Sequence, residues 1–236
     1  MYKVADIVFN AVDCGRTFAV RSCKYRVPCG RPEFTITLPE EELRMCEEEA
    51  PAPRYVHEYL LSGTKFYFGL IRRHGMLLHS SAVVKDGKAY LFTANSGVGK
   101  STHTGYWLEL FPDAYILNDD KPAIRCFDDG IYVYGTPWSG KHDISRNEKV
   151  RLGGIAVVER ADSNFIEPMP PASAAVKILS QTVRKIREER MVELLTTLDR
   201  VLREVPVYRL GCINDKSAAE VSSRVMLSDP AVPVKN

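Results

Sequence analysis

The sequence predicts an α/β protein, and three observations lead to that prediction. Residues 76–93, "MLLHSSAVVKDGKAYLFT", read as two strands joined by a hairpin turn of the Asp-Gly type. The second strand runs into a glycine-rich loop, and "STHTGYWLELF", residues 101–111, continues as a helix. Further strands and helices follow toward the C-terminus, as expected of an α/β protein.

The composition is that of an ordinary globular protein. The 236 residues are 45% hydrophobic and 26% charged, which is enough to bury a sizeable core. A net charge of +2 with scattered basic residues argues against nucleic acid as a partner. The six cysteines form no CxxC pair, which argues against a zinc ribbon. Because the N-terminus lacks a signal-peptide pattern and no long apolar window occurs, we expect a cytoplasmic protein without a membrane partner.

The first 50 residues predict a small β-rich segment that packs on a main domain at residues 51–228. Pro39 and the following carboxylates suit the start of a helix, because negative charge stabilises the positive end of the helix dipole. That helix is expected to end in the linker "EEEAPAP", and residues 229–236 are expected to form a tail. Strands are predicted over residues 3–12, 17–27 and 33–38.

The main domain is expected to open with a helix over residues 54–74, stopped by Gly75 after the basic pair Arg72-Arg73. Residues 171–203 are predicted to be helical, and the last helix is expected to begin at Asn214 or Asp215. Between and around these helices, further strands are predicted in "AYILNDD", "AIRCF", "IYVY", "LGGIAVV" and "VPVYRL".

The stretch 94–101, "ANSGVGKS", ends like a phosphate-binding loop but has Ala94 where the pattern GxxxxGK[ST] has its first glycine. In such a loop, backbone N–H groups at a helix N-terminus cradle phosphate, Lys100 meets the outer phosphates and the Ser101 hydroxyl reaches Mg²⁺. A positive φ at Ala94 would cost about 1–2 kcal/mol, which weakens the motif without excluding it. The competing interpretation is a simple helix-capping turn. The predicted nucleotide-binding residues are Asn95, Ser96, Gly97, Val98, Gly99, Lys100, Ser101 and Thr102.

An acidic pair, Asp119 and Asp120, follows the short predicted strand "YIL". Acids at the carboxyl end of a strand near a phosphate loop fit phosphoryl transfer. One carboxylate can hold Mg²⁺ while the other accepts a hydroxyl proton, because adjacent carboxylates rarely share one environment. The competing interpretation is a pair of turn acids before Pro122. His79 falls in a predicted strand, where a lone histidine is more often a core residue than a catalytic one.

Three segments, "LLHSSAVVKDGKAYLFTANSGVGKST", "LNDDKPAIR" and "GTPWSGK", together resemble the C-terminal domain of HPr kinase/phosphorylase and its relative phosphoenolpyruvate carboxykinase. The resemblance extends from about residue 55 to residue 227 and implies the phosphoenolpyruvate carboxykinase-like fold, with ATP and Mg²⁺ as cofactors. Residue by residue, it implies triphosphate and Mg²⁺ binding at Lys100 and Ser101 and places His79 beside them as a candidate catalytic residue. It also implies a possible homo-oligomer.

The same resemblance implies a base and a metal ligand in the acidic pair, and we favour Asp119 as the base and Asp120 as the metal ligand. Arg125 and Lys141 are candidate phosphate or substrate clamps, with solvated loop and hairpin charges as the competing interpretation. Decarboxylation is less expected than phosphoryl transfer because the chain is much shorter than a carboxykinase.

The sequence therefore predicts an ATP-dependent kinase that transfers the γ-phosphoryl group to a hydroxyl, either of a serine in a protein or peptide or of a small metabolite. A nucleotide-binding regulator without transfer activity is the alternative from a different class. Ala94 keeps that alternative open, as does "EKVRLGGIAVV", which lacks a clear match to the signature that follows the active site of HPr kinase.

Overall fold

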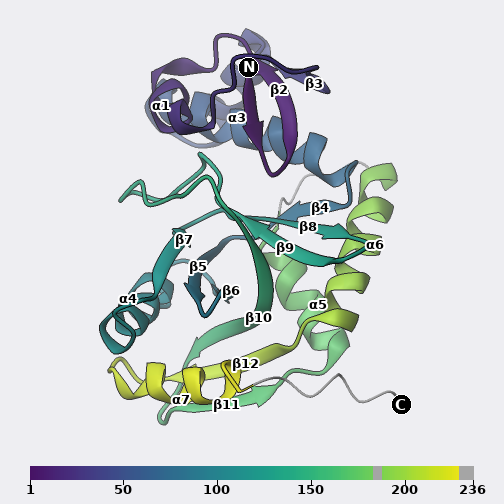
Figure 1. The fold of residues 1–236 in the computed structure, drawn as a ribbon. Helices are drawn as coiled ribbons and strands as arrows, with labels where there is room; N and C mark the ends of the chain where they lie inside the picture. The colour runs from purple at the N-terminus through teal and green to yellow at the C-terminus, as the bar shows by residue number, and fades with distance from the viewer. Residues whose placement is uncertain (183–187, 229–236) are drawn as a thin grey trace.

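The computed structural model describes residues 1–182 and 188–228 and shows a mixed α/β protein with two β-sheets (Figure 1). The predicted fold class is confirmed, with a small N-terminal sheet and a glycine-rich loop between a strand and a helix. The predicted tail at 229–236 lies outside the described residues. Within them, no helix has the length and apolar character needed to cross a bilayer.

The N-terminal sheet has three strands in the order β1-β2-β3, followed in the chain by two helices. Its elements are β1 (Tyr2–Val4), β2 (Ile7–Ala11), α1 (Gly15–Arg21), the 3-10 turn Cys23–Tyr25, β3 (Phe34–Ile36), α2 (Glu40–Glu49) and α3 (Arg54–Ile71). Pro39 is the N-cap of α2, so it lies one position before the first helical residue, the position predicted for it. The helix α3 ends before residue 74, because His74 takes a left-handed backbone conformation with φ 53° and Gly75 already begins the next strand.

The strand predicted over residues 17–27 is wrong, since this stretch forms α1 and the 3-10 turn. Gly15, with φ 79°, turns the chain directly at the start of α1. Phe18 is then buried, with its ring 5.1 Å from Tyr2 and 5.9 Å from Trp138. Burial of this one aromatic ring against distant residues favours the helix. The apolar run itself is too short for its periodicity to distinguish a helix from a strand.

The large sheet has nine strands, and β10 forms its centre. β10 pairs in parallel with β6 and β12 and antiparallel with β9, and it curves through the middle of Figure 1. The rest of the order is β4-β8-β9 on one side and β6-β5-β7 on the other, with β11 beside β12. The strands are β4 (Gly75–Leu77), β5 (Ser80–Lys85), β6 (Lys88–Thr93), β7 (Tyr115–Asn118), β8 (Ala123–Phe127), β9 (Gly130–Tyr134), β10 (Lys149–Arg160), β11 (Phe165–Pro168) and β12 (Val207–Cys212).

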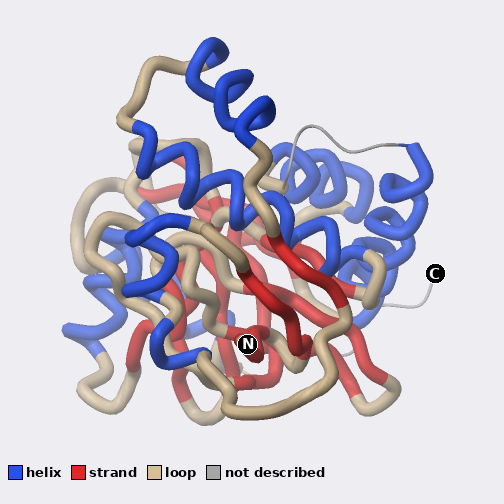
Figure 2. The backbone as a smooth tube through the Cα atoms, turned by 90° about the horizontal axis from the view of Figure 1, so that it is seen from above, coloured by secondary structure: helices blue, strands red, loops and turns tan. Residues whose placement is uncertain are grey.

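Four helices complete the domain, and the view from above shows helices around the strands (Figure 2). They are α4 (Lys100–Leu110), α5 (Pro171–Ser180), α6 (Glu188–Glu204) and α7 (Ser217–Met226). The helical prediction for 171–203 is confirmed in α5 and α6, while residues 183–187 lie outside the described residues. The last helix begins at Ser217 with Lys216 as its N-cap, slightly later than the predicted start at Asn214 or Asp215, and Asp215 accepts a hydrogen bond from the Ser217 N–H.

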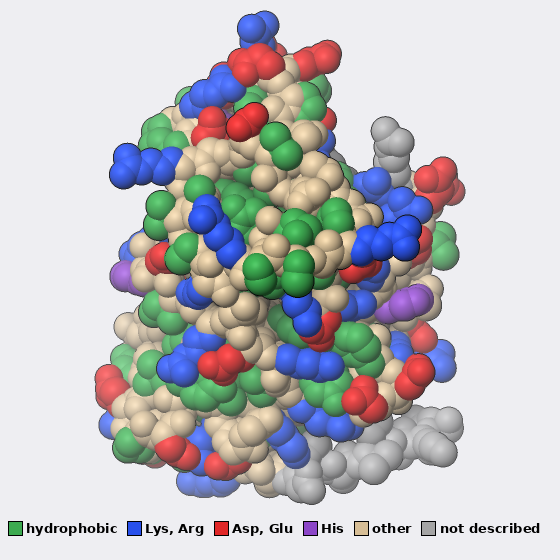
Figure 3. Space-filling model, turned by 45° about the horizontal axis from the view of Figure 1, so that its top comes forward, with side chains coloured by type: hydrophobic (Ala, Val, Ile, Leu, Met, Phe, Trp, Pro, Cys, Tyr) green, Lys and Arg blue, Asp and Glu red, His purple; other side chains and the backbone are tan. Residues whose placement is uncertain are grey.

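Two apolar cores lie on either side of the large sheet. The smaller one surrounds Trp107 of α4, whose indole N–H donates to Ser222 of α7 at 2.9 Å. The larger one joins the N-terminal sheet to the large sheet through α3, where Phe66 stacks on Trp138 at 4.7 Å and contacts Phe9 at 5.2 Å. Outside these cores, side chains of both charges are mixed over the face in Figure 3.

We expect Phe66→Ala to lower the free energy of unfolding by about 3–5 kcal/mol, because the ring is fully buried between the two sheets and its loss leaves a cavity. Urea denaturation followed by circular dichroism measures this change. Tyr55→Ala, at a side chain that is 56% exposed on the same helix, is the control. Equal effects of the two substitutions would contradict the role given to Phe66.

Candidate functional site

The glycine-rich loop leaves β6 at Thr93 and enters α4 at Lys100. Gly97 has φ 78° and Gly99 has φ 120°, conformations that residues with a Cβ atom rarely adopt. A Cβ atom placed on either glycine meets no heavy atom within 4 Å. These glycines are therefore required by the backbone turn, and the space above them is open to a ligand.

Ala94 replaces the first glycine of the motif without the strain considered above. Its backbone φ is not positive, and its methyl group lies buried with the smaller core. The Ala94 carbonyl accepts a hydrogen bond from the Lys100 ammonium at 3.0 Å, so this lysine lies back across the loop. Alanine is accepted here because the loop turns at Gly97 and Gly99 instead.

The start of α4 offers donors that fit phosphate. No side chain caps this end of the helix, and its first backbone bond inside the helix runs from the His103 N–H to the Gly99 carbonyl at 2.9 Å. The N–H groups of the first turn are thus left without a partner in the helix, which favours an anion there. Burial lowers the pKa of Lys100, while the nearby charge of Asp120 acts in the opposite direction. The loop thus supplies backbone N–H groups and a cation to one place.

The direction of the acidic pair is determined by Asn118, a residue that the sequence analysis did not select. Its fully buried side-chain oxygen accepts hydrogen bonds from the backbone N–H groups of Asp120 and Lys121, at 2.9 and 2.7 Å. Its amide nitrogen donates to the Thr136 carbonyl at 3.0 Å. An Asn directly before two turn residues is a signal for such an Asx-turn and would have identified it.

Asp119 is half-buried against the loop that follows Thr136. Its Oδ1 atom accepts a hydrogen bond from the Gly140 N–H at 2.6 Å, and a Cβ atom on Gly140 would lie 3.0 Å from its Oδ2 atom. Burial raises the pKa of Asp119, and the charge of Asp120 raises it further, although the hydrogen bond from Gly140 acts against both. Gly140, in the segment "GTPWSGK", therefore allows the loop backbone to approach this carboxylate.

Asp120 has the opposite electrostatic environment. Burial acts to raise its pKa, but the hydrogen bond with His79 and the charge of Lys121 outweigh burial and hold the pKa at about 2. The His79 Nε2 atom lies 3.2 Å from its Oδ1 atom, and the Lys121 ammonium pairs with its Oδ2 atom. The pKa values of the two neighbouring acids are thus shifted in opposite directions. Asp120 is ionised more firmly, and Asp119 less firmly, than an ordinary aspartate.

His79 lies between β4 and β5, which corrects the prediction of one continuous strand. The chain changes partners there, because β4 pairs with β8 while β5 pairs with β6 and β7. The Nδ1 atom of His79 lies 3.2 Å from the Gln181 side-chain oxygen, and the Gln181 amide donates to the Asn95 side chain at 2.9 Å. A polar chain therefore runs from Asp120 through His79 and Gln181 to the glycine-rich loop.

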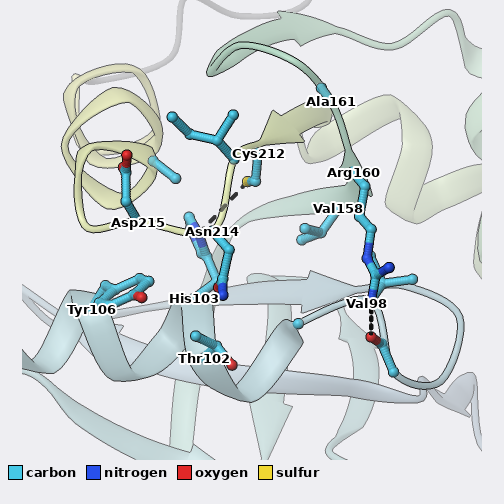
Figure 4. Close-up of a pocket in the computed structure, with 14 residues that line it drawn as sticks. Val98, Thr102, His103, Tyr106, Val158, Arg160, Ala161, Cys212, Asn214 and Asp215 are labelled. Carbon is cyan, nitrogen blue, oxygen red and sulfur yellow. Dashed lines mark hydrogen bonds between the residues drawn. The ribbon is translucent and has the colours of Figure 1, made fainter.

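Three cavities border this site. One of about 510 Å³ lies between the glycine-rich loop, α4 and the start of α7, and Figure 4 shows Tyr106 on α4 opposite Asn214 and Asp215. A second, of about 640 Å³, lies between the loop, β10 and α5. A third, of about 360 Å³, is lined by His79 and Lys121 together with Thr64 and Thr182. The phosphate loop thus has space on both sides, and His79 faces a separate pocket.

The structure adds one residue at the loop and removes another. Arg160, at the end of β10, donates to the Gly97 carbonyl at 3.1 Å and borders the first two cavities (Figure 4). Arg125 does not reach the site, because its guanidinium donates to the carbonyls of Ala5 and Arg73 beside the N-terminal sheet. Lys141 is exposed and directly follows Gly140 in the loop that holds Asp119.

His103 lines the cavity of about 510 Å³, but its ring is buried and its Nε2 atom lies 3.0 Å from the Ser222 hydroxyl. Burial lowers the pKa of His103 to about 4, so the ring is neutral at neutral pH. Its contact with α7 is therefore structural.

No protein-family model and no curated protein matches the chain. Among solved structures, the chain is similar to the Hpr(Ser) kinase/phosphatase from Coxiella burnetii, with 14% sequence identity and a TM-score of 0.28. That likeness covers 53% of this chain and 96% of the other.

We expect Asp120→Asn to flatten the dependence of stability on acid pH. The pKa of Asp120 is lower in the folded protein than its ordinary value of 3.8, so the ionised carboxylate stabilises the fold above about pH 4, and this contribution is lost as the pH falls toward 2. Between pH 5 and pH 3, the free energy of unfolding of the wild type should fall by about 1 kcal/mol more than that of the variant. Urea denaturation at both pH values measures this difference. Parallel profiles for Asp120→Asn and for the exposed control Asp162→Asn would contradict the assignment.

Proposed function

We propose that the protein is an Mg²⁺-dependent kinase that transfers the γ-phosphoryl group of ATP to a hydroxyl. One observation carries the proposal: a chain of polar contacts runs from Asn95 of the glycine-rich loop through Gln181 and His79 to Asp120, which follows β7, so the loop and the acidic pair belong to one site. A phosphate cradle beside an acidic pair is the arrangement that phosphoryl transfer needs, since catalysis there consists of positioning and charge stabilisation.

The donor set fits a nucleoside triphosphate with Mg²⁺. The first backbone N–H groups of α4 and the Lys100 ammonium would bind the phosphates, and Arg160 would add a second cation from the other side of Gly97. The exposed Ser101 hydroxyl and the firmly ionised Asp120 carboxylate are the oxygen ligands that Mg²⁺ prefers. When bound, Mg²⁺ supplies positive charge that offsets the charge of the phosphates.

Asp119 would act as the base. A carboxylate whose pKa is raised accepts a proton more readily than Asp120, which is held ionised by His79 and Lys121. In the transfer, the acceptor oxygen forms a bond to the γ-phosphorus as the bond from that phosphorus to the β–γ bridging oxygen breaks. The hydroxyl proton passes to Asp119, and ADP leaves.

The acceptor would enter through the cavity of about 360 Å³ beside His79 and Lys121. Hydroxyl and amide groups from Thr64, Thr182 and Gln181 also line it, so it suits a small polar group. Either a serine side chain of a protein or peptide or a small metabolite fits this description. Whether labelled phosphate from ATP ends on protein or on a small molecule distinguishes the two.

A second candidate is a nucleotide-binding regulator without transfer. It is favoured by Gln181, which follows α5 and connects the loop residue Asn95 to His79. Through this side chain, occupancy of the loop would be communicated to α5. Retention of the γ-phosphate by ATP, with water or any hydroxyl acceptor, would favour this candidate over the kinase.

We expect Lys100→Ala to weaken binding of Mg²⁺·ATP on the order of 10- to 100-fold, because a charged hydrogen bond to phosphate is worth about 1.5–3 kcal/mol. Calorimetric titration of the nucleotide into each protein measures the affinity. Lys3→Ala, which removes an exposed lysine of the N-terminal sheet, is the control. No binding by the folded wild type, or equal affinities for wild type and Lys100→Ala, would overturn the assignment of the loop.

We expect Asp119→Asn to reduce γ-phosphate loss from ATP about 100-fold or more, the range typical of a lost general base, while nucleotide affinity stays within about twofold. Release or transfer of labelled γ-phosphate gives the rate, and calorimetry gives the affinity. Asp128→Asn, in the acidic hairpin between β8 and β9, is the matched control. Full activity of Asp119→Asn would remove this residue from the base role.

A further inference from the structure

A second cavity system lies away from the phosphate loop, where β3, α2, α3 and α6 meet. Its volume is about 940 Å³, and we call it the basic groove. In Figure 1 the first turn of α6 lies nearest to the N-terminal sheet, at the upper right. The residues that define the groove are Phe34, Lys65, Phe68, Arg72, Arg73 and Arg190.

Two of the four cations in the basic groove are already neutralised. Arg73 pairs with Glu33, and Lys65 pairs with Glu42. For Arg72 and Arg190, by contrast, the structure of residues 1–182 and 188–228 contains no acidic partner. These two guanidinium groups therefore leave an excess of positive charge in the groove.

Aromatic side chains lie among these charges. The Arg190 guanidinium lies 4.3 Å from the centre of the Phe68 ring, and the Arg73 guanidinium lies 5.3 Å from that of Phe34. Both rings are only partly buried. Cations held over aromatic rings are kept in place at the groove wall, and the rings offer apolar surface to a ligand.

The shape and charge of the groove favour a peptide over nucleic acid. The groove is lined by three consecutive residues, Glu33, Phe34 and Thr35. Successive side chains of a strand face opposite sides of the sheet, so a groove that touches all three runs along the edge of β3. β3 pairs with β2 on one side and is the edge strand of its sheet, as the order of the described strands shows. Edge strands bind extended peptides through the backbone. The two cations that are unpaired in the described part of the chain, Arg72 and Arg190, suit a segment with a few carboxylates, whereas a continuous row of phosphates is bound by more cations than that.

We propose that the basic groove binds an extended acidic segment of a partner protein, whose carboxylates pair with Arg72 and Arg190 and whose apolar side chains pack on Phe68. The inference does not depend on the nucleotide site. It does bring a partner close to it, because Thr64, which lines the pocket beside His79, lies one turn before Phe68 on α3.

The test uses a fluorescein-labelled peptide of alternating Glu and Leu, six residues long, and the full chain at low salt without nucleotide. Fluorescence anisotropy gives the affinity. We expect Arg72→Glu combined with Arg190→Glu to weaken binding at least tenfold, because two attractive contacts become repulsive. The matched control, Arg16→Glu with Arg224→Glu, makes the same change in net charge at exposed arginines outside the groove and should stay within twofold of wild type.

Circular dichroism verifies that each variant is folded. If the double glutamate variant is not folded, Arg72→Gln combined with Arg190→Gln replaces it, and this variant is expected to weaken binding several-fold. Lys100→Ala should bind the peptide as the wild type does, which separates this result from failure of the nucleotide site. Three outcomes would overturn the proposal: no binding by the wild type, equal loss in the control variant, or equally tight binding of a six-nucleotide oligothymidylate at the groove.

Discussion

The buried amide of Asn118 is the constraint on which the candidate site depends. It lies at the end of β7, accepts hydrogen bonds from two successive backbone N–H groups and donates to the Thr136 carbonyl. The turn that results directs Asp119 toward Gly140 and Asp120 toward His79. Because an unpaired buried amide is costly, this turn has few alternatives, and the two acids cannot exchange environments.

Different surroundings then give two identical side chains different chemistry. Burial and the charge of Asp120 raise the pKa of Asp119 against the opposing effect of the hydrogen bond from Gly140, whereas the His79 ring and the Lys121 ammonium keep Asp120 ionised. The turn after Asn118 therefore supplies both a carboxylate that accepts protons more readily, Asp119, and one that stays ionised, Asp120. The loop opposite contributes positive charge from Lys100, and Gln181 connects that loop to His79.

Much of the arrangement could be predicted from local patterns. The hairpin before the loop, the loop itself and the helix after it have strong local signals, and the structure has them where the patterns indicate. Other features had no such signal. The strand predicted over 17–27 is a helix because Phe18 packs on residues distant in the chain, and Arg125 is drawn to the N-terminal sheet by the carbonyls of Ala5 and Arg73.

The sequence by itself determined the chemistry available along the chain: a glycine-rich turn before a helix, a lysine and a serine at its start, and two acids after a strand. Only the tertiary structure decided which of these groups meet. Gln181 reaches Asn95, and Arg72 and Arg190 line one groove, across long separations in sequence. Hydrogen bonds and charges act over a few ångströms, so their partners follow from the packing of β4, β5 and the helices and not from local pattern.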